Sequence, residues 1–596
     1  MADTPSPTPL SFTEFPPLST AAWQERIRRD LKGQDPETLR WHSPEGIVVE
    51  PFYHHEALDA LAGPTGPYVR SDSANAWLNV PTYLVPALDN GHAAIDRAAD
   101  ALQRGADGVH FDLTDAATFD VAYLAQRLPL ATTYIGYSTR TTPLLLVQRL
   151  LTASNDTLRG FLRFDPVTDH LLDLQAQLTG LREVLLLTRH LPEFRALTVN
   201  GAYFGNRGGT ATQQLAFALA TAAYYLCCLP SAELDRATVA AAMQIQVAIN
   251  PGYFTEIAKL RALRRLWATV LFAHKLPQET AARLRIYAST ASWSQTTLDP
   301  HTNLLRTTTE AMAAVLGGAD VVSVTPFDSL FAAPNELADR LARNIPTLLR
   351  TEAHLHQVAD PAAGSYYLET LTDELARNAW ALFQEIEAGG GMPRAIRLVL
   401  QQLQATTQAQ FRRIATGEQV VVGTNRYQNP REKFSFNPKR LLRSADFDST
   451  RAAYPSEVLQ LATALHFQRR EKKLKRAAVV LLGAHTNQHI LESFLQTLPV
   501  HERPELRASH PEGTVSVLLS SSEAATLMYA TPEQFMHLAR LVHRVPEDDL
   551  TFIPPPLLTS DLATMQEAVQ FFGFKEFTVE GYSTEDVLAR LQGKVS

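Results

Sequence analysis

The stretch from Ser289 to Asp328, STASWSQTTLDPHTNLLRTTTEAMAAVLGGADVVSVTPFD, decides the fold class of this chain. It completes one run that favours a β-strand, Ile286–Thr290, and contains a second, Val321–Phe327. The residues between these runs predict a helix, because side chains recurring at steps of four form one packed face: Leu304, Thr308, Met312 and Leu316. Two parallel strands joined by a helix make a βαβ unit, and such sheets need helices on their faces. The stretch therefore predicts an α/β protein.

Both ends of this helix carry signals in the sequence. We expect Asp299 to be the N-cap and Pro300 to occupy the first helical position, where its missing N–H costs nothing. Gly317 and Gly318 should end the helix, because glycine adopts the left-handed conformation found just past a helix end. Residues 299–318 thus predict one complete helix.

The composition restricts the class of protein. The chain has 596 residues and a net charge of −8, so we expect two or three domains and no nucleic acid or anionic membrane as partner. Cys227 and Cys228 are adjacent, which argues against a disulfide between them or a metal site and fits a reducing compartment. The beginning of the chain lacks the features of a signal peptide, and residues 216–229, the longest run of low polarity, fall short of the ~18 residues of a membrane span. We predict a cytoplasmic protein.

Short β-favouring runs alternate with helical ones from residue 76 to residue 327. Two of the intervening helices are clear, Thr210–Leu226 and Tyr253–Ala273. Eight βα units over roughly 250 residues predict a (β/α)8 TIM barrel. The eight predicted strands are Trp77–Tyr83, Gly108–Leu113, Ala131–Tyr137, Leu158–Phe164, Ala196–Gly201, Met243–Ile249, Arg285–Thr290 and Val321–Phe327.

We divide the chain into four parts. Residues 1–50 form an N-terminal arm, which contains a predicted helix at Ala21–Leu31 and large apolar side chains that must be buried against this chain or a partner. Residues 51–403 form the barrel, and residues 404–472 form a linker. Residues 473–596 form a smaller α/β domain with an open parallel sheet. Its predicted strands are Ala477–Leu482, Thr514–Ser520, Thr551–Pro554 and Phe577–Glu580.

Common motifs for catalysis and phosphate binding are absent from the sequence, including the P-loop, the dinucleotide fingerprint and the nucleophile elbow. Residues 206–209 precede a helix and could bind an anion through free N–H groups, although a glycine loop at the barrel rim is the simpler explanation. We predict no metal site, because the best-placed histidine pair lacks a third ligand nearby and the others are weaker: His485 with His489, then His54–His55 and His354 with His356.

Six further segments carry a family resemblance together with Ser289–Asp328. They are NRGGTATQQLAFALATAAYYL (206–226), YFTEIAKLRALRRLWA (253–268), LADRLARNIPTLLRTEAHL (337–355), DPAAGSYYLETLTDELARNAW (360–380), EIEAGGGM (385–392) and VVGTNRYQ (421–428). In this order they resemble the adenosylcobalamin-dependent acyl-CoA mutases, above all the methylmalonyl-CoA mutase family. The resemblance implies a barrel whose channel takes the acyl-CoA, a flavodoxin-like domain that holds the corrin, and radical chemistry supplied by the cofactor.

Departures from the family pattern indicate that this chain is not catalytic. Catalytic chains carry Asp-x-His-x-x-Gly after the first strand of the C-terminal domain, and this resemblance implies that the histidine ligates cobalt. Here Asn487 stands at that position, and an amide is a poor cobalt ligand; Ile490 replaces the glycine. Tyr203 replaces a barrel histidine that lies near the substrate carbonyl in catalytic chains. We therefore expect no catalytic residue, no metal and no cofactor on this chain.

The chain most resembles the small (β) subunit of heterodimeric methylmalonyl-CoA mutase. That resemblance implies a structural role beside a larger catalytic chain, which carries the adenosylcobalamin, interconverts methylmalonyl-CoA and succinyl-CoA, and is contacted by the arm. Two alternatives stay open: a self-sufficient acyl-CoA mutase with atypical cobalamin binding, and a free acyl-CoA-binding protein. Thr290, Ser292 and Trp293 lie at the carboxyl end of the seventh predicted strand, where barrels place ligand contacts, and are candidates for the substrate channel.

Overall fold

The computed structural model describes residues 18–59, 61, 75–141, 143–169, 174–415 and 418–427, together with short pieces further along the chain. These pieces are residues 436–437, 440–441, 450–454 and 457, and five short strands between residues 506 and 583. Asn487 and Ile490 lie outside the described residues.

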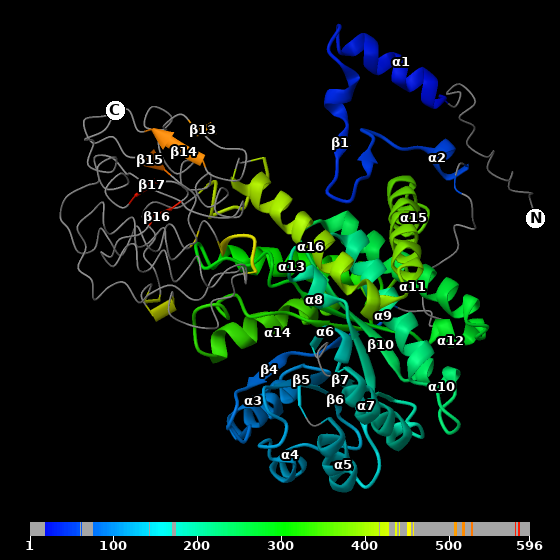
Figure 1. The fold of residues 1–596 in the computed structure, drawn as a ribbon, viewed down its shortest axis with the longest axis vertical. Coiled ribbons are helices and arrows are strands. Elements are labelled where there is room, and N and C mark those ends of the chain that lie inside the picture. The colour runs from blue at the N-terminus through cyan, green and yellow to red at the C-terminus, as the bar shows by residue number, and fades with distance from the viewer. Residues whose placement is uncertain are drawn as a thin grey trace, which may run out of the picture.

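Two five-stranded parallel sheets form the centre of the described chain (Figure 1). One sheet has the order β4-β5-β6-β7-β8 and the other the order β3-β12-β11-β10-β9. Because β3 leads into β4 and β8 leads into β9, the sheets meet at both ends and form a TIM-barrel-like ring with eight strand positions. The strands are β3 (Leu78–Asn79), β4 (Thr82–Val85), β5 (Gly108–Leu113), β6 (Tyr134–Thr139), β7 (Arg159–Arg163), β8 (Phe194–Arg195), β9 (Leu197–Asn200), β10 (Met243–Ile249), β11 (Arg285–Thr290) and β12 (Val321–Ser323).

The predicted α/β class with parallel sheets is confirmed, and each of the eight predicted runs overlaps a strand of the ring. Two runs are shorter or interrupted for a physical reason. Val80 and Pro81 separate β3 from β4, since proline has no N–H to donate to a neighbouring strand. The last run ends early at Ser323, ahead of Pro326.

Helices cover the outside of the ring (Figure 1). Thr210 begins the most buried of them with a capping box that pairs it with Gln213. No helix in the described ranges is long and apolar enough to cross a membrane. The helices are α3 (His92–Gln103), α4 (Val121–Arg127), α5 (Pro143–Ala153), α6 (Pro166–Asp169), α7 (Leu174–Thr188), α8 (Ala202–Gly205), α9 (Ala211–Cys228), α10 (Arg236–Ala241), α11 (Tyr253–Ala273), α12 (Gln278–Ala282), α13 (Thr302–Leu316), α14 (Glu336–Thr351), α15 (Tyr366–Ala388) and α16 (Met392–Ala415).

Helix α13, in the opening stretch, begins later than the sequence predicts. Asp299 adopts a left-handed conformation with φ of 48°, and its carboxylate accepts the hydroxyl of Thr302 at 2.6 Å. The prediction that Asp299 is the N-cap is therefore wrong. His301 occupies that position and makes no side-chain cap hydrogen bond.

The buried face of α13 also differs from the predicted one by one position. Asn303, Thr307 and Ala311 are buried, whereas Met312 and Leu316 are only partly buried. Two polar side chains thus lie where an apolar face was expected. The end of the helix agrees with the prediction, because Gly318 takes a left-handed φ of 83°.

A second layer of helices lies over α9 and α11. Helix α15 packs against both, and Arg261 of α11 joins the two layers through ion pairs with Asp360, at 3.1 Å, and Glu369, at 2.7 Å. All three side chains are almost fully buried, so the opposite charges compensate each other in a place that water does not reach. Helix α16 continues to Ala415, so the boundary predicted at residues 403 and 404 falls inside a helix.

The N-terminal arm consists of α1 (Thr20–Asp30), a short 3₁₀ helix (Pro36–Leu39), the antiparallel strands β1 (Trp41–His42) and β2 (Val48–Val49), and α2 (His55–Asp59). It reaches over the layer of α15 (Figure 1). The ring of Tyr53 lies 5.2 Å from that of Tyr367 on α15, and Ile47 is buried. Trp23 and Trp41 remain 41% and 48% exposed. The arm therefore buries part of its apolar surface against its own chain and leaves part uncovered.

Strands described near the C-terminus are β13 (Leu506–Ala508), β14 (Val515–Leu518), β15 (Thr526–Leu527), β16 (Thr578–Val579) and β17 (Tyr582–Ser583). Their pairs are antiparallel, unlike the parallel sheet that the sequence predicts for residues 473–596. The predicted strands Ala477–Leu482 and Thr551–Pro554 lie outside the described residues.

Candidate functional site

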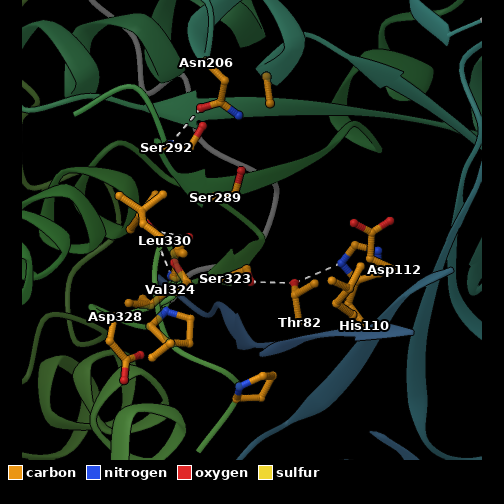
Figure 2. A pocket seen from close by; sticks show the side chains of 18 of the residues that line it. Thr82, His110, Asp112, Asn206, Ser289, Ser292, Ser323, Val324, Asp328 and Leu330 are labelled. Atoms are coloured by element: carbon orange, nitrogen blue, oxygen red, sulfur yellow. Dashed lines mark hydrogen bonds between the residues drawn. The ribbon is translucent and has the colours of Figure 1, made fainter. Parts of the chain in front are cut away.

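The ring encloses a cavity of about 1170 Å³ at the carboxyl ends of its strands (Figure 2). Its walls come from the strand ends and from the loops that follow them, above all residues 324–335 after β12 and residues 200–207 after β9. Helix α8 occupies the second of these loops. A cavity in this place is where barrels of this kind bind ligands.

Apolar side chains close the opposite end of the ring. Phe161 is fully buried, and its ring centroid lies 6.1 Å from that of Tyr134 and 5.1 Å from that of Tyr287. Gly136 makes room for this ring, because a Cβ atom there would lie 2.2 Å from it. With Val80 and Val321 these rings form one buried cluster, so the cavity opens toward the carboxyl ends of the strands.

Directly above this cluster lies a layer of hydrogen-bonded polar side chains from five strands, β4, β5, β6, β11 and β12. Nδ1 of His110 lies 3.0 Å from the hydroxyl of Thr82 and 3.1 Å from that of Tyr287. Its Nε2 lies 2.5 Å from the hydroxyl of Ser138. Thr82 in turn lies 2.9 Å from the hydroxyl of Ser323, so the network crosses the ring from β6 to β12 (Figure 2).

The environment of His110 keeps its ring neutral. Burial lowers the pKa of His110 to about 3, because a charged imidazole would lose its hydration there. A ring with so low a pKa is not protonated at neutral pH and cannot serve as a general acid. His110 is the one histidine among the described residues that line the cavity.

Charged side chains lie nearer the mouth. Arg163 donates from Nε to the hydroxyl of Ser138 at 2.8 Å, and its terminal nitrogen lies 3.9 Å from Asp112. Arg97 is paired with Asp339, to which its Nε donates at 3.0 Å. Further charged residues of the cavity wall are Arg140, Asp169, Arg207, Asp328 and Arg440. The cavity wall thus carries charges of both signs, which suits a polar ligand.

Tyr203, which the sequence resemblance places at a barrel histidine of catalytic chains, lies on the cavity wall in α8. Its backbone N–H donates to the side chain of Asn200 at 3.1 Å. The guanidinium of Arg207 covers its ring, with the central carbon 3.7 Å from the ring centroid. The phenol ring of Tyr203 is therefore stacked under a cation on the cavity wall, at a position where the resemblance implies a histidine ring in catalytic chains.

Two of the three predicted channel residues line the cavity. Thr290 is buried and lies 3.0 Å from the hydroxyl of Thr325, whose N–H it accepts at 2.9 Å. Ser292 has its backbone N–H bonded to the side chain of Asn206 at 3.0 Å (Figure 2).

Trp293, the third predicted channel residue, is not among the residues that line the cavity. It is 4% exposed and stacks on Phe411 of α16 with ring centroids 5.5 Å apart. Trp293 therefore packs between the barrel and α16.

The polar layer was not predicted from the sequence. His110 stands alone in the run GVHFDL, where an isolated histidine reads as a core residue, and its partners come from positions 82, 138 and 287. One signal was available: alternate residues of β5 and β11 are polar, namely His110 with Asp112 and Tyr287 with Ser289, as expected for strands facing a polar interior.

Comparisons with known proteins agree with this architecture. The model of the methylmalonyl-CoA mutase family matches residues 152–487. A methylmalonyl-CoA mutase small subunit of Porphyromonas gingivalis is 34% identical over 441 residues, which cover 70% of this chain and 71% of that protein. A methylmalonyl-CoA mutase small subunit of Streptomyces virginiae is 36% identical over 453 residues, which cover 70% and 71%.

A methylmalonyl-CoA mutase of Cereibacter sphaeroides is 29% identical, and the match spans 69% of this chain but 64% of that protein. The family model and the extent of these matches show that the chain belongs to the methylmalonyl-CoA mutase family.

Proposed function

We propose that this chain is the small, non-catalytic subunit of a heterodimeric methylmalonyl-CoA mutase. The observation that carries the proposal is Tyr203 on the cavity wall under the guanidinium of Arg207. A phenol offers no imidazole to a substrate carbonyl, and the one histidine of the cavity wall is neutral and hydrogen-bonded on both sides. The similarity to two small subunits supports the same role.

The partner in this proposal is a larger homologous chain. Exposed apolar side chains on the arm support a contact there, because Trp23, Leu39, Trp41 and Val48 are each more than 40% exposed in the isolated chain. Such side chains usually become buried in an assembly. The arm would therefore complete its core on the partner.

The adenosylcobalamin of the complex would be carried by the partner. Asn487 stands where the family's cobalt-ligating histidine is found, and an amide is a poor donor to cobalt. The residues of this chain thus do not fit the cofactor, and we assign them no part in its chemistry. Cys227 and Cys228 are both free thiols, which suits the cytoplasm as the compartment of the complex.

Cobalamin titration of the isolated chain tests the proposal. The isolated chain should leave the absorption spectrum of added adenosylcobalamin unchanged and should retain none of it on gel filtration. After co-expression with a larger chain that has intact Asp-x-His-x-x-Gly, the complex should bind the cofactor stoichiometrically. Binding of the corrin by this chain alone, or turnover without a partner, would overturn it.

Trp41→Ala tests the contribution of the arm. We expect weaker co-purification with the larger chain, because large aromatic side chains dominate binding energy when they become buried at an interface. Leu88→Ala is the matched control, since Leu88 is 88% exposed on the barrel itself. Equal recovery of the partner with both variants would contradict an arm interface.

The size and charge of the cavity favour one second candidate, binding of an acyl-CoA by this chain. Calorimetric titration with succinyl-CoA should then give heat that Arg163→Met reduces, since the guanidinium of Arg163 lines the cavity and bonds to Ser138 of the polar layer. Arg140→Met alters the rim instead and should have a smaller effect. The absence of binding to the wild-type chain would remove this candidate.

A further inference from the structure

Two histidines and a glutamate gather in the arm, far from the cavity. His54 precedes α2, and His55 and Glu56 are its first two residues. One nitrogen of each ring and one carboxylate oxygen of Glu56 lie within 4.8 Å of one another. The Nδ1 atoms of the two imidazoles are 3.2 Å apart and face each other. Figure 1 shows α2 beneath α1 in the same arm.

Thr20, the first residue of α1, determines which nitrogen of His54 carries a proton. The Thr20 hydroxyl donates its one hydrogen to Glu56, whose carboxylate also accepts the Thr20 backbone N–H at 3.1 Å. The hydroxyl can therefore only accept from Nε2 of His54, which lies 2.6 Å away. The neutral ring then holds its proton on Nε2, and its Nδ1 presents a lone pair toward His55.

This arrangement has the pattern of a prepared metal site. A metal-binding histidine commonly donates its other ring N–H to an oxygen, which fixes the tautomer and the ring orientation, and Thr20 provides that oxygen here. Nitrogen and oxygen ligands lie about 2.0–2.2 Å from Zn²⁺, so tetrahedral ligand atoms are roughly 3.3 Å apart. The 3.2 Å between the two Nδ1 atoms matches that spacing.

Charge and exposure fit a cation as well. The carboxylate of Glu56, held by two hydrogen bonds from Thr20, places an oxygen ligand with negative charge beside the two imidazole rings. The side chains of His54 and Glu56 are 23% and 41% exposed, which leaves a route for an ion and room for water as a further ligand. Imidazole ligands favour zinc and its neighbours over Mg²⁺ or Ca²⁺.

We propose that His54, His55 and Glu56 bind one divalent transition-metal ion of the zinc class, with Thr20 as a positioning residue. By fixing His54 and Glu56, the ion would also stabilise their hydrogen bonds to Thr20 at the start of α1. This inference does not rest on the role of the chain in an assembly.

Calorimetric titration of the full, tag-free chain with Zn²⁺ tests the site. After treatment with a chelator, the wild-type chain should bind one equivalent, and Mg²⁺ should give no heat. His55→Ala should abolish this binding, and the exposure of His55 means that its replacement leaves the metal-free fold intact. His190→Ala is the matched control, because His190 is another exposed histidine beside a carboxylate, 3.0 Å from Asp156.

Thr20 separates a prepared site from adventitious binding to histidines. Thr20→Val should weaken Zn²⁺ binding by about 10- to 100-fold, whereas Thr20→Ser, which keeps the hydroxyl, should restore it. Bound Co²⁺ offers a second readout, since its visible spectrum reports nitrogen and oxygen ligation in the wild-type chain and should vanish in His55→Ala. No Zn²⁺ binding by the wild-type chain, or equal binding by His55→Ala, overturns the proposal. Equal affinity in Thr20→Val and Thr20→Ser overturns the role of Thr20.

Discussion

Glu45 of the arm caps the buried helix α9 at Thr212, whose backbone N–H donates to its carboxylate at 2.8 Å. The other carboxylate oxygen accepts the N–H of Ala211 at 2.9 Å, and Thr210 satisfies the N–H of Gln213. A buried helix start needs such partners, because its first N–H groups have none within the helix. The anion that residues 206–209 could attract is thus supplied from the chain's own arm.

Glu45→Ala should destabilise the chain by about 1 kcal/mol, the usual cost of losing a helix cap, and should release the arm from the barrel. Limited proteolysis followed by mass spectrometry would show faster cleavage in residues 18–53, and urea unfolding would report the loss of stability. Glu37→Ala is the control, because Glu37 pairs with Arg40 inside the arm and is exposed. Cleavage of Glu45→Ala at the wild-type rate would contradict the contact.

Glu310 of α13, within the stretch Ser289–Asp328, is a buried acid. It is 1% exposed and accepts the hydroxyl of Ser294 at 2.7 Å. Burial raises the pKa of Glu310 from 4.5 to about 8, with the nearby carboxylate of Glu256 adding to the shift. The folded chain therefore holds a proton on Glu310 at neutral pH, while the unfolded chain does not.

The sign of the pH effect follows from that difference. Between pH 4.5 and about 8 the unfolded state binds fewer protons at this position, so the free energy of unfolding falls as pH rises. The side chain of Glu310→Gln does not titrate in this range. The free energy of unfolding of this variant relative to wild type should therefore be greater at pH 8 than at pH 5. Thermal unfolding at several pH values measures the difference, with the exposed Glu279→Gln as control. A constant difference between wild type and Glu310→Gln across this range would be inconsistent with a buried neutral acid.

The sequence predicted the ring of strands well and the contents of the ring poorly. Strand runs such as Met243–Ile249 are β-favouring and bounded by turns, so local pattern suffices to find them. Asp299 misled the prediction of the helix start, because Gly423, 124 positions later, packs against its side chain, which no local pattern shows. The network of His110 depends on closure of the ring, which joins residues far apart in the chain.

Trp293 is a further residue whose surroundings could not be predicted from the local sequence. Its position after β11 predicted a channel residue, yet its ring contacts Gly208 and Phe411, and its carbonyl accepts the N–H of Ala452 at 3.0 Å. Gly208 has a left-handed φ of 81°, and a Cβ atom there would lie 2.7 Å from the indole. The contacts come from segments distant in sequence, so the strand end alone could not reveal which way the side chain lies.

Trp293→Ala should therefore cost about 3–5 kcal/mol of stability, as expected for a large buried aromatic side chain, without altering ligand binding in the cavity. Urea unfolding measures the loss, and Trp41→Ala is the control, since a half-exposed tryptophan in the isolated chain should change stability by about 0.5 kcal/mol or less. A small loss of stability together with weaker ligand binding would instead indicate that Trp293 contributes to the channel.

His110 gives a pH dependence of the opposite sign to that of Glu310. Burial lowers the pKa of His110 from 6.5 to about 3, so between these values the unfolded chain binds a proton that the folded chain does not. The free energy of unfolding should fall as pH drops through this range. His110→Gln keeps hydrogen-bonding groups in the network but cannot titrate, so its stability relative to wild type should improve from pH 7.5 to pH 4.5. Thermal unfolding checks this, with the exposed His190→Gln as control. If the relative stability of His110→Gln is the same at both pH values, the imidazole is not held neutral in the folded ring, and a proton-transfer role for the cavity has to be reconsidered.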